Sequence, residues 1–241
     1  MNLRFILVEP AVPENVGAAA RAVKTMGHTE LVLVNPQCQL DGKALWVAHA
    51  SEEIVLNSKR FATLAEALEG SDFSVATTAK ERKVKCDPVS SRELAAFLAS
   101  RRSASDTVSV VFGREESGLT NEEVKLCDIS TQVPMKQLYP SLNLAQAVMI
   151  YAYELSALSL DISGPEGTET DDVPLHLLKE RTGKVLTNIE IPVTDARYGR
   201  IMERLSLLSP SDVRLLLTVT DKIIGSGPAA RTGRRAEGAG K

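Results

Sequence analysis

The chain has 241 residues, of which 44% are hydrophobic and 24% charged, so it can bury a full core without disulfides. A net charge of −3 and only 4% aromatic residues argue against a generally basic nucleic-acid binder and against a stacking face for single-stranded RNA. No apolar run reaches the roughly 18 residues of a membrane span, Arg4 and Pro10 leave no signal peptide, and the three cysteines are far apart, so we expect a cytoplasmic protein with reduced thiols.

Short apolar runs alternate with helical patterns along the chain. The apolar runs predict strands at 5–8, 31–34, 73–76, 108–112 and 129–133. The intervening patterns predict helices at 13–26, 46–56, 64–68, 94–99, 121–126 and 144–158. In this alternation, continuous apolar strands indicate an α/β fold with a parallel sheet and helices on both faces. Ligands of such sheets bind beyond the carboxyl ends of the strands, which directs attention to the loops after Val8, Ala76, Phe112 and Val133.

The composition changes near residue 161 and divides the chain into four predicted parts. Residues 1–160 form the α/β domain, and residues 161–173 form an acidic, Gly-bearing linker. Residues 174–225 form a helical extension of two or three segments, in which Ser209 and Pro210 begin a helix. Residues 226–241 form a basic tail that we expect to be disordered. A second basic cluster, rich in lysine and arginine, occupies residues 80–85.

Three segments combine polar residues with positions at strand ends. The segment 13–21 places Asn15 and Arg21 on one helix, where Arg21 can also be read as a solvated surface residue. The segment 112–119 has two glycines between a strand and a helix, which allow the backbone to approach a ligand, although such turns are common. The segment 133–148 contains Ser141, which can cap the following helix and leave N–H groups free for a polar ligand.

Several other kinds of site are not supported by the sequence. There is neither a GxxxxGK[ST] phosphate loop nor a GxGxxG dinucleotide motif. The histidines and cysteines have no metal-ligand spacing, so we expect no metal. An enzyme that uses a nucleotide on an ordinary doubly wound sheet therefore remains only a minor alternative, because it would need a phosphate loop.

Together, and in this order, the three segments resemble the motifs of SPOUT methyltransferases. The stretches ILVEP, PENVGAAARAVKTMG, LVLVNP, VVFGREESGLTNEE and PSLNLAQAVMIYAYEL are most similar to the TrmJ branch of the TrmH-like RNA ribose methyltransferases. The resemblance covers residues 2–160. The one departure is Pro13-Glu14 before Asn15, where some relatives carry small or polar residues.

This resemblance implies a fold, a cofactor and a reaction. It implies a deep trefoil knot at the C-terminal end of the domain, a homodimer whose RNA sites combine both chains, and S-adenosylmethionine as methyl donor to a ribose 2′-hydroxyl. We expect the alanine-rich first helix and the helix from Leu144 to form the dimer interface. The expected catalytic residues, by resemblance, are Arg21, Asn15, Glu115, Ser141 and Asn143. The expected cofactor-binding residues, mainly through their backbone, are Thr77, Thr78, Gly113, Gly118, Met135, Ser141 and Leu142.

The roles of the catalytic set are those that the resemblance implies, adjusted by general chemistry. A guanidinium stays protonated at neutral pH, so Arg21 suits a contact with the neighbouring phosphate and the developing alkoxide better than the role of a base. We expect Asn15 to support it and Glu115 to orient either Arg21 or Asn143. The resemblance favours tRNA as substrate, at cytidine or uridine 32 of the anticodon loop. The alternatives are ribosomal RNA, another tRNA position, or an inactive knotted RNA-binding paralogue.

Overall fold

The computed structural model describes residues 1–79, 88–103, 106–137, 141–158 and 175–225. The predicted acidic linker, the basic cluster at 80–85 and the basic tail lie outside these residues. The chain divides into two compact units, Met1–Thr168 and Glu169–Lys241, and each is described by itself.

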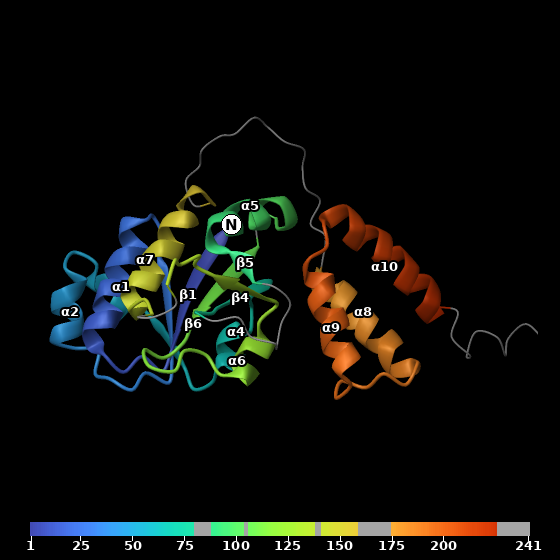
Figure 1. Ribbon diagram of the computed structural model, residues 1–241, viewed down its shortest axis with the longest axis horizontal. Coiled ribbons are helices and arrows are strands. Elements are labelled where there is room, and N and C mark those ends of the chain that lie inside the picture. Colours follow the sequence, from blue (N-terminus) through green and yellow to red (C-terminus); the bar gives the residue numbers. More distant parts are fainter. Residues whose placement is uncertain (80–87, 104–105, 138–140, 159–174, 226–241) are drawn as a thin grey trace, which may run out of the picture. The chain divides into compact units, whose positions relative to one another are not determined.

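Seven strands form a single sheet in the described part of the first unit (Figure 1). The strands are β1 (Asn2–Val8), β2 (Glu30–Val34), β3 (Lys59–Phe61), β4 (Phe73–Thr77), β5 (Val89–Ser90), β6 (Thr107–Phe112) and β7 (Ile129–Gln132). Their order is β3-β2-β1-β6-β4-β7-β5, and every pairing is parallel. The predicted parallel α/β sheet is therefore confirmed.

Helices cover both faces of this sheet, as Figure 1 shows. They are α1 (Pro13–Thr25), α2 (Lys43–Ala48), α3 (Glu52–Leu56), α4 (Leu64–Leu68), α5 (Ser91–Arg101), α6 (Asn121–Leu126) and α7 (Leu144–Glu154), followed by the short 3₁₀ helix η1 (Ser156–Leu158). On one face, α4 and α6 pack on buried aliphatic side chains such as Ile6 and Val111. On the other, aromatic pairs join the sheet to α7 and α5, with ring centroids 5.6 Å apart for Phe112 and Tyr151.

Two expected helical boundaries were wrong. The helix predicted at 46–56 is divided into α2 and α3, because His49 and Ala50 adopt positive φ angles of 25° and 60°. Residues other than glycine rarely adopt positive φ angles, and a residue with such an angle ends a right-handed helix. The helix predicted to reach residue 158 ends at Glu154, and η1 follows after a short break.

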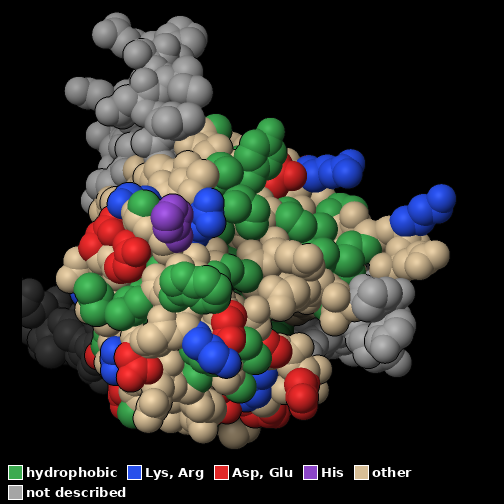
Figure 2. Space-filling view, turned by 90° about the vertical axis from the view of Figure 1, so that its left-hand side faces the viewer, with side chains coloured by type: hydrophobic (Ala, Val, Ile, Leu, Met, Phe, Trp, Pro, Cys, Tyr) green, Lys and Arg blue, Asp and Glu red, His purple; other side chains and the backbone are tan. Residues whose placement is uncertain are grey.

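The outer helix α2 lies very close to α1. A Cβ atom added at Gly17 of α1 would come within 2.1 Å of the Ala44 carbonyl oxygen of α2, so only glycine allows this approach. The side of the unit that carries these helices exposes hydrophobic side chains (Figure 2). Trp46 of α2 is 81% exposed, and Met149 and Tyr153 of α7 are also exposed.

The second unit contains three helices in residues 175–225: α8 (Leu175–Asn188), α9 (Ala196–Ser206) and α10 (Pro210–Gly225). Helix α8 packs against both others, and its Leu178 is fully buried. An ion pair between Arg181 and Asp221 also joins α8 to α10. The Ser209 hydroxyl accepts a hydrogen bond from the Asp212 N–H, as its predicted place at the start of a helix requires.

Candidate active site

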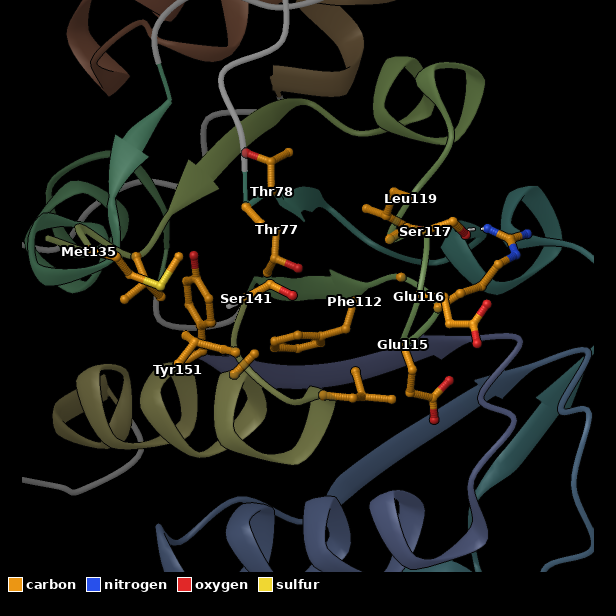
Figure 3. A pocket seen from close by; sticks show the side chains of 18 residues that line it. Thr77, Thr78, Phe112, Glu115, Glu116, Ser117, Leu119, Met135, Ser141 and Tyr151 are labelled. Carbon is orange, nitrogen blue, oxygen red and sulfur yellow. Dashed lines mark hydrogen bonds between the residues drawn. The ribbon is translucent and has the colours of Figure 1, made fainter. Parts of the chain in front are cut away.

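A pocket of about 370 Å³ lies at the carboxyl edge of the sheet (Figure 3). It is formed by the segments that follow β4, β6 and β7 and by the first turns of α7. These segments meet because β6, β4 and β7 are neighbours in the sheet. The pocket therefore lies where ligands of parallel sheets bind.

All seven residues predicted to bind a cofactor line this pocket. They are Thr77, Thr78, Gly113, Gly118, Met135, Ser141 and Leu142. The two threonine hydroxyls are already used within the protein, since Thr77 Oγ1 donates to the Val111 carbonyl at 2.9 Å and Thr78 Oγ1 to the Thr131 carbonyl at 3.3 Å. The protons of these two hydroxyls are therefore not free to bind a ligand, and the expected binding through the backbone stays a prediction.

Sequence reasoning missed the apolar part of the pocket. Phe112, Leu119, Ala147 and Tyr151 also line it, and Figure 3 shows Phe112 and Tyr151 along one side. Burial raises the pKa of Tyr151, whose hydroxyl donates to Thr131 Oγ1 at 3.3 Å, so this phenol stays protonated at neutral pH. The signal was present in the sequence, because Leu144, Val148 and Tyr151 follow the helical spacing of a buried face.

The loop 113–118 closes on itself. The backbones of Arg114 and Gly118 exchange two hydrogen bonds of 3.2 and 3.0 Å, and Gly118 has a φ of 68°. A Cβ atom on Gly113 would lie 2.0 Å from the Gly118 carbonyl carbon. The two glycines therefore allow two parts of the loop to approach each other closely.

Glu115 connects this loop to the start of α1. Its carboxylate accepts hydrogen bonds from the Ala11 N–H at 3.1 Å, the Val12 N–H at 3.2 Å and Asn15 Nδ2 at 3.1 Å. Burial by itself would raise the pKa of Glu115, but the bonds from Asn15 and the two backbone groups lower it below its usual value. The side chain is therefore an anchored carboxylate at neutral pH.

Asn15 and Asn143 extend this connection to α7. Asn143 Nδ2 donates to Asn15 Oδ1 at 2.9 Å, so Glu115, Asn15 and Asn143 form one hydrogen-bonded chain. Asn143 is also the N-cap of α7, where its Oδ1 accepts from the Ala145 N–H at 2.8 Å. The prediction that Ser141 caps this helix was therefore wrong: Ser141 lies two residues earlier and lines the pocket instead. Asparagine and serine are similarly good caps, which made the sequence ambiguous.

Arg21 lies apart from these residues within one chain. It is exposed on α1, and no contact of its guanidinium is found among the described residues. Glu115 contacts Asn15 rather than Arg21, so of the two expected partners of Glu115 it is Asn143 that is reached, through Asn15. Five predicted catalytic residues thus divide into a connected set of three, a pocket residue and a free surface cation.

Two other features are absent from the described ranges. No group of three or more His, Cys, Asp or Glu side chains there is arranged to hold a metal ion. No helix in the same ranges is long and apolar enough to cross a membrane.

Comparison with known proteins gives consistent matches over most of the chain. The sequence model of the SpoU rRNA Methylase family matches residues 2–153. The "Uncharacterized tRNA/rRNA methyltransferase LasT" of Escherichia coli (strain K12) is 44% identical over 216 residues, which are 90% of this chain and 94% of that protein. The tRNA (cytidine/uridine-2′-O-)-methyltransferase TrmJ of Yersinia enterocolitica is 39% identical, over 86% of this chain and 83% of that one. The crystal structure of TrmJ from Z. mobilis ZM4 has a TM-score of 0.63 at 27% identity, covering 92% of this chain and 99% of that one.

Proposed function

Since the chain belongs to the SpoU methylase family of RNA methyltransferases, we propose that it methylates a ribose 2′-hydroxyl of tRNA with S-adenosylmethionine as donor. The proposed target is cytidine or uridine 32 of the anticodon loop. The observation that carries the proposal is the convergence on one pocket of the segments that follow β4, β6 and β7. Seven residues selected from the sequence as cofactor-binding all line it, although up to 65 positions separate them.

The pocket has the character that the cofactor requires. Its volume of about 370 Å³ falls in the range of small-molecule sites, and it combines an apolar side with exposed backbone groups. The apolar side, with Phe112 and Tyr151, suits the adenine ring and the aliphatic carbons of the methionine part, and the backbone of 113–118 and 141–142 suits the polar edges. Once bound, the sulfonium supplies an electrophilic methyl group.

Glu115, Asn15 and Asn143 act by holding the site together. The Glu115 carboxylate already accepts three hydrogen bonds and has a lowered pKa, which makes it a poor acceptor for a ribose proton. Its role is to fix the amide of Asn15, which in turn fixes Asn143 at the start of α7. Preorganisation of this kind lowers the barrier because fewer groups have to reorient during the reaction.

Arg21 acts on the RNA. Its guanidinium is exposed and uncommitted in the described part of a single chain, so it is available to bind the phosphate beside the target ribose and to stabilise the developing alkoxide. In a homodimer this contact is made next to the partner's pocket.

The proposed dimer interface consists of the outer faces of α1 and α7. The alanines Ala19, Ala20 and Ala22 are buried within the chain itself, so they cannot form the interface. Helices α1 and α7 contact one another, and α7 exposes Met149 and Tyr153. Apolar side chains gathered on one face favour association.

Two further parts of the proposal concern the chain around this site. The trefoil knot at the C-terminal end of the domain is expected from the resemblance, and the helices α8–α10 help to hold the tRNA. Among the residues of the third motif, 138–140 lie outside the described ranges.

The test is a comparison of 2′-O-methyl groups in tRNA and ribosomal RNA from cells with and without the gene, followed by methyl transfer with the purified protein. Loss of one methyl group at tRNA position 32, restored in vitro, is the expected result. A loss confined to ribosomal RNA favours the alternative that the family description and the LasT name suggest. No difference in either RNA, with no transfer in vitro, contradicts the proposal.

A further inference from the structure

Arg114 joins three elements at the carboxyl edge of the sheet. Its Nε donates to Glu9 Oε2 at 2.7 Å, and its two terminal nitrogens donate to the two carboxylate oxygens of Glu123 at 3.0 and 2.9 Å. Glu9 follows β1, Arg114 follows β6, and Glu123 belongs to the first turn of α6. The bidentate pair with Glu123 has the geometry in which arginine binds carboxylates most strongly. These bonds raise the pKa of Arg114 and lower that of Glu9.

The guanidinium also acts on the loop that forms one wall of the pocket. Arg114 Nη1 donates to the Gly118 carbonyl at 3.3 Å, in addition to the two backbone bonds between these residues. The next residue, Glu115, begins the hydrogen-bonded chain to Asn15 and Asn143. In Figure 3, Glu115, Glu116 and Ser117 lie along the same side of the pocket. The position of Arg114 therefore sets both the shape of this wall and the starting point of the Glu115 contacts.

Backbone strain next to Arg114 points in the same direction. Glu9 and Asn35 have φ angles of 46° and 45°, in the left-handed region that non-glycine residues rarely adopt. The two are linked, because Asn35 Nδ2 donates to Glu9 Oε1 at 3.2 Å and the Glu9 N–H donates to the Val34 carbonyl at 2.8 Å. Strained residues persist where their surroundings over-determine them, and they gather at functional sites. Asn35, Glu9, Arg114 and Glu123 thus form a second network beside the Glu115 chain.

We propose that Arg114 is a positioning residue of the methyl-transfer site, which holds the loop 113–118 in the shape that binds the cofactor and places Glu115. It acts through the loop and Glu115 and not on the reacting atoms, because its guanidinium is committed to two carboxylates and a carbonyl. This inference rests on the proposed function, since it assumes that the pocket binds S-adenosylmethionine.

A matched control exists in the same domain. Arg4 forms a comparable set of bonds, to Glu30 at 3.2 Å and to Ser71 Oγ at 3.1 Å, and its side chain is more buried than that of Arg114, at 7% against 23% exposed. It lies near the amino-terminal end of β1, away from the pocket. Arg4→Met therefore removes a buried arginine without touching the loop.

The experiment compares the full-length protein with its variants Arg114→Met, Arg114→Lys and Arg4→Met. For each protein the melting temperature is measured first. The Kd for S-adenosylmethionine is then measured by calorimetry, well below that melting temperature. Both methionine variants should melt earlier, but only Arg114→Met should raise the Kd, by ten-fold or more. Arg114→Lys should also raise the Kd, and the rise in log Kd should be more than half of that in Arg114→Met, since an ammonium cannot make the bidentate pair. Glu9→Gln should raise the Kd less than Arg114→Met, and add nothing in the Arg114→Met background.

Three outcomes decide the matter. A Kd for Arg114→Met within two-fold of the parent, or an equal rise in Arg4→Met, means that Arg114 contributes only to stability. If Arg114→Met does not fold, the Kd values of Arg114→Lys and Glu9→Gln are compared with that of the parent instead. The inference is overturned if both variants bind the cofactor with the Kd of the parent. If the parent protein itself binds no cofactor, the proposed function fails, and this inference with it.

Discussion

The substitution Asn15→Asp tests the hydrogen-bonded chain of Glu115, Asn15 and Asn143 most directly. It preserves the size and shape of a buried side chain that is 9% exposed, but replaces the amide donor with a carboxylate oxygen. That oxygen would face Glu115 Oε1 at the 3.1 Å that now separates donor from acceptor. Asn15→Ala is the reference, because it removes both hydrogen bonds of the amide without adding a charge, whereas Asn15→Asp keeps an oxygen that accepts from Asn143 Nδ2.

The size of the effect can be worked out from these contacts. Two ordinary hydrogen bonds contribute roughly 0.5–1.5 kcal/mol each, so Asn15→Ala should lower the free energy of unfolding by about 1–3 kcal/mol. Two like charges about 3 Å apart repel by about 1 kcal/mol at the dielectric constant of water and about 5 kcal/mol at an effective value of 20. Because Asn15→Asp keeps the bond from Asn143, it should be less stable than Asn15→Ala at pH 7 by the repulsion minus about 1 kcal/mol, which is about 4 kcal/mol at an effective dielectric constant of 20.

The difference in stability between Asn15→Asp and Asn15→Ala should depend on pH. Repulsion raises the folded-state pKa of the carboxyl pair above the unfolded value near 4, so the extra loss in Asn15→Asp is present at pH 7 and disappears as the pH falls towards 4. Urea denaturation at both pH values, with methyl transfer measured at pH 7, is the assay. If Asn15→Asp is as stable as Asn15→Ala at pH 7, or if their difference does not narrow on acidification, the Glu115–Asn15 contact has been misread.

Four other outcomes are expected. Arg21→Ala should fold and bind cofactor normally, since Arg21 is exposed, but should lose about 10²-fold or more in methyl transfer; a parental rate would make Arg21 a plain surface residue. Titration calorimetry in the presence of a chelator should show saturable S-adenosylmethionine binding, and its absence at millimolar cofactor would contradict the pocket assignment. A chain ending near Leu160 should remain dimeric by light scattering, whereas a clean monomer at micromolar concentration would refute the α1 and α7 interface. Burial lowers the pKa of His28, so stability should fall as the pH drops below about 6.5, the unfolded value, and His28→Phe should show a weaker fall in urea titrations between pH 7.5 and 5.5.

The sequence predicted the central sheet well because its strands are buried on both faces. Continuous apolar runs such as Phe5–Val8 have few other uses in a chain of this length. The strands that were missed are those without this signal: β3 reads Lys-Arg-Phe and lies at one edge of the sheet, and β5 consists of only two residues at the other. Their pairing depends on the neighbouring strand and not on their own composition.

The site was predicted as residues and not as contacts. The motif resemblance selected Glu115, Asn15 and Asn143, but their order in one hydrogen-bonded chain depends on side-chain positions that no spacing encodes. The bonds of Arg114 to Glu9 and Glu123 were missed for the same reason. The positive φ angle at Glu9 could not be foreseen either, because glutamate rarely adopts it and the surroundings impose the conformation.

The position of β6 between β1 and β4 affects how the protein can form during synthesis. One edge of β1 pairs with β2 and the other with β6. The partner of Leu3 on β6 is Val108, which is synthesised about 100 residues later. At roughly 5–20 residues per second, ribosomes take about 5–20 s to reach that partner. During that time the nascent chain carries an apolar strand with one open edge, which is the kind of surface that aggregates or recruits chaperones. The loops that form the pocket come together only after this closure, so a nascent chain shorter than about 110 residues should have neither the sheet centre nor the site.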